Sequence, residues 1–261
     1  MKSIRYNFYM ICIKKGFTGK MKYGQQYYDF EEGTMSFISP GQVVSMLDIN
    51  DEDILSGELL IFHPDFVRSY ALAKQIKNYG FFSYAVNEAL HLSEKEHAMI
   101  ETIMGNIERE YAAVIDPYSQ DVIVSHIELL LNYCNRFYNR QFITRKVANN
   151  DLLSRLETLL ADYFDSDKVH ETGIPTVQYV SEQLNISATY LSDMLRSLTG
   201  QSTQQHIHNQ LIEKAKEILT TSSLSVSEIA YRLGFEYPQS FNKLFKSKTN
   251  LSPLKFRQSF N

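Results

Sequence analysis

The last third of the chain contains one pattern written twice, and this repeat limits the fold more than any other feature. Residues 180–186 align with residues 229–235 at a constant offset of 49 positions. Apolar residues occupy corresponding places in both copies, and each copy has a small residue, Ser181 or Ala230, in its first expected helix. This layout predicts two helix-turn-helix units, because a small residue lets two short helices cross closely after a tight turn.

The second helix of each unit shows which of its sides faces inward. Leu191 and Leu195 align with Phe241 and Phe245 at an offset of 50 positions, so these four apolar residues are expected to be buried. The opposite face of each second helix is then free to enter a major groove of DNA.

Charge is distributed unevenly along the 261 residues. The net charge is -4, but residues 174–261 hold nine Lys/Arg and six Asp/Glu, which leaves a net charge of -7 for residues 1–173. A basic module joined to an acidic one is compatible with nucleic-acid binding despite the negative total. Cys12 and Cys134 form no ligand cluster, and the N-terminal stretch lacks a signal-peptide pattern. These features predict a cytoplasmic location and no membrane segment.

The first 92 residues are rich in aromatic and β-branched residues interrupted by Gly, Pro and Asp. Short strands are predicted at residues 8–13, 27–30, 34–38, 58–62 and 81–84. Several short strands at this spacing favour a small barrel or sandwich.

Residues 93–140 change to helical periodicity, with apolar residues at steps of three and four on two expected helices. Pro117 is expected to open the second of them. Two interpretations are open: the apolar stripes, which include Ile127 and Leu130, cover the open face of the barrel, or a remaining stripe pairs with a second subunit. Residues 141–150 are predicted to be a linker.

The helical domain is expected to span residues 151–261. It begins with an amphipathic helix from Leu152, and a long connecting helix is predicted over about residues 203–219 between the two helix-turn-helix units. The second unit is expected over residues 225–250, and Ser252-Pro253 predicts the start of a last short helix.

At this point the residues carry a family resemblance. LSVSEIA at 224–230, LGF at 233–235 and FNKLFK at 241–246, followed by Ser252-Pro253, resemble the signature of AraC/XylS-type transcription regulators in order and spacing. The resemblance implies an α+β chain: a cupin-like N-terminal barrel for sensing or effector binding, a helical dimerisation segment, and an all-α tandem helix-turn-helix domain. It also implies double-stranded DNA as partner, a homodimer, contact with RNA polymerase, an activator role and an unknown small-molecule effector.

The chain departs from the family pattern in three places. Leu195-Arg196 stands where the family usually has Phe-Lys, and Asn250 replaces a usual glycine. Asparagine also tolerates the left-handed conformation expected there. The connecting helix has His208 and Gln210 where basic residues are usual, which argues against phosphate contacts from that helix.

The resemblance, together with the outward phase of the two second helices, gives the residues expected to contact DNA. Their chemistry is suitable, since Gln can bond adenine, Lys can donate to guanine and Asp can accept from cytosine. The alternative for the charged members is that they are ordinary solvated side chains. The residues are Thr189, Ser192, Asp193, Arg196, Pro238, Gln239, Ser240, Asn242, Lys243 and Lys246.

No catalytic residue, metal site or cofactor is expected. The chain lacks a phosphate-binding glycine loop, an HExxH pair and a nucleophile elbow. A metal-binding cupin needs a histidine cluster, whereas the β-rich part has only His63 and His91. His206 and His208 are two positions apart on an expected helix, so they point to different faces. The other interpretations of the chain are a ligand-binding or protein-interaction module and a metal-dependent cupin enzyme.

Overall fold

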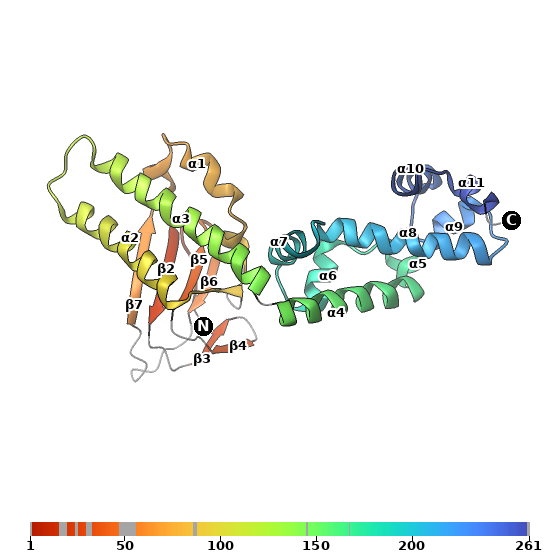
Figure 1. The fold of residues 1–261 in the computed structure, drawn as a ribbon, viewed down its shortest axis with the longest axis horizontal. Helices are drawn as coiled ribbons and strands as arrows, with labels where there is room; N and C mark the ends of the chain where they lie inside the picture. The colour runs from red at the N-terminus through yellow and green to blue at the C-terminus, as the bar shows by residue number, and fades with distance from the viewer. Residues whose placement is uncertain are drawn as a thin grey trace. The chain divides into compact units, whose positions relative to one another are not determined.

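Figure 1 shows the computed structural model of the protein, which has two compact units, Met1–Thr144 and Arg145–Asn261. Each unit has its own hydrophobic core and is described by itself. The described residues are 2–15, 20–23, 26–29, 33–46, 56–85, 88–144, 146–166 and 168–259.

The first unit contains a four-stranded antiparallel sheet in the order β7-β2-β5-β8 (Ser56–Phe62, Tyr9–Lys15, Thr34–Ile38, Leu90–His91). Two further pairs are β1 with β6 (Lys2–Arg5, Val43–Met46) and β3 with β4 (Lys20–Tyr23, Gln26–Asp29). Ile11 lies opposite both Phe37 and Leu60, so the three side chains share one face of the sheet. Ile11 and Phe37 are buried there.

Four of the five predicted strands are confirmed with ends shifted by two residues or fewer, but the strand expected at residues 81–84 is wrong. Residues Gly80–Ser83 form a 3-10 turn, η3. Phe81 and Phe82 are both buried, against Phe37 and its neighbours. A strand would send adjacent residues to opposite faces, whereas a helical turn can bury both. The described strands also do not close into the expected cupin-like barrel, since β7 and β8 are the two edges of the larger sheet.

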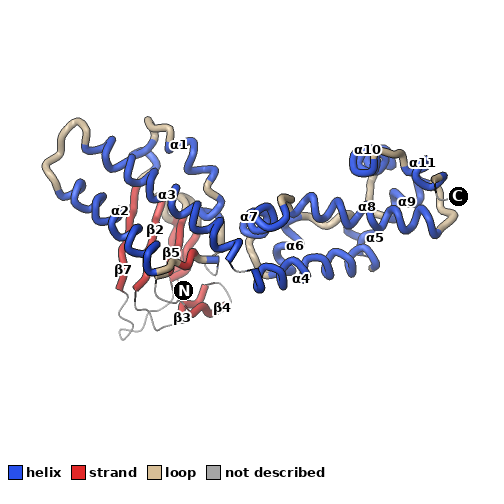
Figure 2. Tube along the Cα trace, in the orientation of Figure 1, coloured by secondary structure: helices blue, strands red, loops and turns tan. Residues whose placement is uncertain are grey.

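Two long helices cover one face of this sheet. Figure 2 shows them as the hairpin α2 and α3 (Glu94–Ala112, Ser119–Thr144). Ser93 begins α2 with a capping box to Glu96, and α3 begins two residues after Pro117. Ile127 and Leu130 are fully buried within the unit, so these two residues pack inside it and are not available to pair with a second subunit. The short elements η1, α1 and η2 (Pro64–Val67, Leu72–Gln75, Ile76–Asn78) lie between the sheet strands β7 and β8 in the chain.

The second unit is all helical, as predicted. Residues 141–150 are helical wherever they are described, because α3 extends to Thr144 and α4 begins at Lys146. The unit contains α4 (Lys146–Asp165), α5 (Lys168–Thr172), α6 (Val177–Leu184), α7 (Ala188–Thr199), α8 (Thr203–Thr221), α9 (Val226–Arg232), α10 (Pro238–Thr249) and α11 (Pro253–Gln258). In the described residues, no helix has both the length and the apolar character needed to cross a membrane.

Candidate nucleic-acid interface

The two repeats fold into the same helix-turn-helix backbone. In the first turn, Asn185 N–H donates to the carbonyl of Glu182 and Ile186 N–H donates to that of Ser181. In the second, Gly234 and Phe235 donate to Tyr231 and Ala230 in the same pattern. Asn185 and Gly234 both have positive φ, 58° and 81°. Each turn is therefore a Schellman-type helix end followed directly by the next helix.

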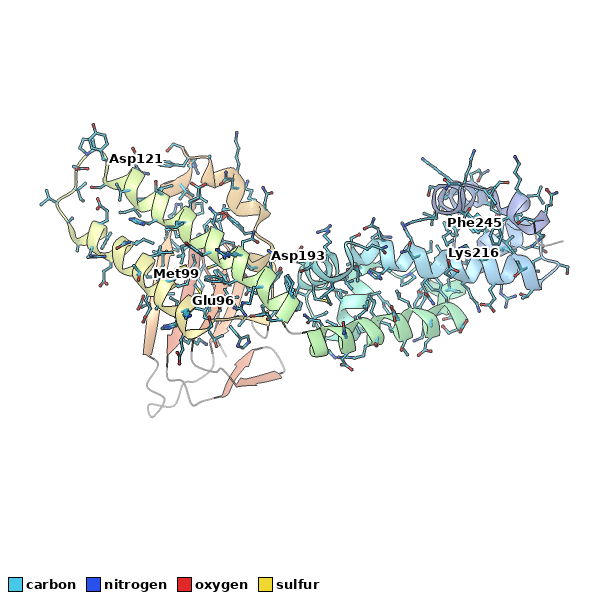
Figure 3. All side chains as sticks on the ribbon, viewed as in Figure 1. Glu96, Met99, Asp121, Asp193, Lys216 and Phe245 are labelled. Carbon is cyan, nitrogen blue, oxygen red and sulfur yellow. The ribbon has the colours of Figure 1, made fainter. Side chains whose placement is uncertain are left out.

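The second helices of the two units, α7 and α10, have the predicted buried sides. Leu191, Leu195, Phe241 and Phe245 are each 0% exposed. Phe245, labelled on α10 in Figure 3, packs against Phe241 and Phe256, with ring centroids 5.7 and 5.4 Å away. Because these residues are buried, the opposite faces of α7 and α10 are the ones that point away from the core.

The outer face of α10 is exposed, uncapped and basic. Gln239, Ser240, Asn242, Lys243 and Lys246 are all exposed, and Pro238 is half-buried. The helix contains three lysines and no acidic residue. Its N-cap residue makes no side-chain hydrogen bond to the first turn, so the backbone N–H groups there can meet an anion.

The outer face of α7 is less exposed and has no net charge. Thr189, Ser192 and Asp193 are half-buried, and Arg196 is exposed. Arg196 Nη1 lies 3.5 Å from Asp193 Oδ1, which offsets its charge. The first turn is also closed, because Ser187 Oγ accepts a hydrogen bond from Tyr190 N–H.

Two contacts tie α7 to the start of the connecting helix α8. Ser192 Oγ lies 3.0 Å from Thr203 Oγ1, and Thr199 Oγ1 lies 3.0 Å from His206 Nε2. Ser192 therefore shares its hydroxyl between the protein and any DNA base it would contact.

A polar chain runs from the end of α7 to α10 across α8. Asn209 Nδ2 donates to Gln201 Oε1 at 2.8 Å, and Lys248 Nζ donates to Asn209 Oδ1 at 3.0 Å. Sequence reasoning missed Asn209 and Gln201, because Asn209 and Lys248 are 39 positions apart and no local pattern links them. These two hydrogen bonds link the two helix-turn-helix units to each other across α8.

The cations on α8 are occupied within the protein. Lys214 Nζ lies 2.6 Å from Asp165 and 2.9 Å from Glu217, and these hydrogen bonds raise the pKa of Lys214. Lys216, labelled on α8 in Figure 3, has its Nζ 2.7 Å from Glu213 Oε1. Both lysines of α8 therefore have acidic partners within the protein.

Three of the histidines, His63, His206 and His208, have hydrogen-bond partners within the protein. His208 Nε2 lies 2.9 Å from Gln204 Nε2, and burial lowers the pKa of both His206 and His208. His63 is the N-cap of η1, where its Nδ1 accepts from Asp65 N–H at 3.2 Å. Within the described residues no three His, Cys, Asp or Glu side chains gather as metal ligands.

Comparison with known proteins identifies the family. Residues 180–259 match the model of a family described as a helix-turn-helix domain. The HTH-type transcriptional activator RhaS of Salmonella agona (strain SL483) is 26% identical over 259 residues, which cover 97% of this chain and 86% of the relative. The chain is an AraC/XylS-type DNA-binding transcription regulator.

Two further comparisons match this AraC/XylS-type regulator over most of the chain or over less than half of it. RhaS of Salmonella dublin is 25% identical over 254 residues, with 97% of this chain and 86% of the relative covered. Among solved structures, the C-terminal domain of AraT from Geobacillus stearothermophilus is 29% identical, with a TM-score of 0.36, over 41% of this chain and 84% of that chain. The family match begins in α6, so α4 and α5 of the regulator belong to the same compact unit but precede the matched domain.

Proposed function

We propose that the regulator reads a specific DNA site with its two helix-turn-helix units, which enter successive segments of the major groove. The observation that carries this proposal is the matched backbone of the two helix-turn-helix units, which the single continuous helix α8 joins. α8 has 19 residues, or about 28 Å at the rise of an α-helix. That length is close to one DNA turn, roughly 34 Å.

The proposed base and backbone contacts are the ten residues expected from the sequence: Thr189, Ser192, Asp193 and Arg196 on α7, and Pro238, Gln239, Ser240, Asn242, Lys243 and Lys246 on α10. Exposure on the outer face of α10 supports Gln239, Asn242 and Lys243 most strongly. Ser192 and Asp193 have weaker support, because both already have partners within the protein.

We infer that the first unit senses a signal or forms a dimer, and a cupin-like barrel remains a prediction for it. Val122, Leu129 and Ile143 are exposed apolar residues of α3, separated by multiples of seven positions. Residues at this spacing lie along one stripe of a helix, and such a stripe can pair with a second copy. The dimer seam is therefore proposed for these residues and not for the buried Ile127 and Leu130.

The remaining partners follow from the proposed role. RhaS is named as an activator, and by this likeness we propose activation through contact with RNA polymerase in the cytoplasm. Regulators of this family are generally not enzymes, so no catalytic activity or cofactor is proposed.

The test is binding to a DNA site selected from random sequence and to its point variants. Gln239→Ala and Lys243→Ala are expected to relax discrimination by about 1–3 kcal/mol at one base pair each, because a base contact is lost. Lys255→Ala, which removes an exposed charge from α11, is the control and should leave discrimination unchanged. Equal loss on specific and random DNA would show that both residues contact only phosphate. If the chain is instead a protein-interaction module, it will not show DNA binding whose affinity falls steeply with salt concentration.

A further inference from the structure

The first unit contains a cavity of about 730 Å³ between the sheet and the α2–α3 hairpin. Residues 58–62 of β7 line one side, and α2 and α3 line the other. The volume lies within the range of small-molecule sites, roughly 300–1,000 Å³. Figure 1 shows α2 running along the β7 side of the sheet.

The inner wall of this cavity is apolar. Met104, Ile107, Glu108 and Tyr111 line it from α2, at spacings that put them on one face of the helix. Ile107 and Ile127 are buried, whereas Leu60 on β7 and Ile123 on α3 are half-buried and keep apolar surface open to solvent. Tyr111, in contrast, is 79% exposed and marks the opening to solvent. A ligand with a hydrocarbon body would therefore remove apolar surface from water on binding.

The charged groups of the lining are acidic. Glu58 on β7 and Glu108 on α2 contribute carboxylates, His63 contributes an imidazole, and the described lining includes no Lys or Arg. Arg109, the neighbour of Glu108, bonds to Gly105 O and Asn106 Oδ1 on its own helix. The lining therefore attracts a cation and repels an anion.

Glu108 and Tyr111 lie three positions apart, so the carboxylate and the ring are neighbours on the helix surface. A carboxylate pairs with an ammonium group, and the face of a tyrosine ring attracts the same cation. The two groups together provide a place for a positively charged head beside the apolar wall.

We propose that this cavity binds a small amphipathic cation, with a hydrocarbon body against Leu60 and Ile123 and an ammonium head between Glu108 and Tyr111. The proposal deepens the sensing role proposed for the first unit and rests on that role only for its regulatory consequence. Binding itself is a property of the cavity.

The test is calorimetric titration of the full chain with octylammonium, and with octanoate and 1-octanol as anionic and neutral probes of the same length. Octylammonium is expected to bind once per chain and more tightly than either of the others. Glu108→Gln should weaken its binding about threefold to fivefold, the value of a partly exposed ion pair. Glu110→Gln, on the same helix but outside the lining, should leave binding unchanged.

Tyr111→Ala provides a second variant at an exposed position and should weaken octylammonium by about twofold to fivefold without affecting octanol. Absence of octylammonium binding, equal binding of octanoate, or equal effects of Glu108→Gln and Glu110→Gln would overturn the proposal. The proposal would also be overturned if a second copy of the chain covers the cavity. In that case octylammonium binding would weaken at the protein concentrations at which sedimentation detects dimers. Gel shifts on the same samples without probe report the DNA-binding function separately.

Discussion

The two helix-turn-helix units have the same backbone but present different surfaces to DNA. Both turns use the same pair of backbone hydrogen bonds, and α7 and α10 both end in a left-handed residue, Gly200 and Asn250. α10, however, contains three lysines and exposed polar residues, whereas α7 pairs its single Arg196 with Asp193. The two helix-turn-helix units therefore share their backbone geometry, whereas positive charge is concentrated on α10 of the second one.

This difference suggests a division of work between the units. Phosphate attraction provides most of the affinity of DNA-binding proteins and is set by free cations. Because α10 has those cations, the second helix-turn-helix unit is expected to supply most of the affinity for DNA. α7, with half-buried hydroxyls and a balanced charge, is expected to add orientation and selectivity.

The largest expected effect concerns the two turns. A Cβ at Gly234 would lie 2.9 Å from the backbone of Gly173, and φ there is +81°. Gly234→Ala should lower the free energy of unfolding by more than about 2 kcal/mol, since strain and a clash add. Asn185→Ala introduces the same residue at the matching turn, where a Cβ already exists, and should cost about 1 kcal/mol. Urea unfolding measures both, and equal losses would contradict the role given to the Gly173 contact.

The next effect concerns the charge difference between α7 and α10. Replacing Lys243 and Lys246 by Gln should reduce the slope of log affinity against log salt by up to about 1.8, because two cations that release counterions from the DNA disappear, whether each contacts a base or a phosphate. The affinity should fall by more than about tenfold. The matched change in the first unit, Asp193→Asn with Arg196→Gln, keeps the charge of α7 at zero. If this second variant changed the salt slope as much as the lysine variant, the division of work would be wrong.

A smaller effect is expected for the polar chain across α8. Asn209→Ala removes hydrogen bonds to both Gln201 and Lys248, and should weaken binding to the full site by about 1 kcal/mol. Binding to DNA that retains only the segment contacted by α10 should change less, because orientation between the units no longer matters. Gln204→Ala, on the same helix, is the control. Equal weakening on both DNA fragments would assign Asn209 a purely local role.

The sequence predicts more of the second compact unit, Arg145–Asn261, than of the first, Met1–Thr144. The helix-turn-helix spacing, the four buried residues and the left-handed Asn250 all depend on local periodicity and capping, which sequence records directly. The turn at Gly80–Ser83 was missed because two adjacent aromatic residues are buried by tertiary contacts. The polar chain through Asn209 and the cavity beside β7 join residues far apart in sequence, and no local pattern encodes them.

The most direct test of the account is the spacing of the two DNA segments. Once both are located by footprinting, five base pairs are inserted between them, which turns one segment to the opposite face of the DNA. Because α8 is one continuous helix, the account predicts that affinity falls to that of a site with one segment. An insertion of ten base pairs should not restore it, since α8 cannot lengthen. Undiminished binding after the insertion of five base pairs would contradict the claim that the two helix-turn-helix units bind successive segments of the major groove.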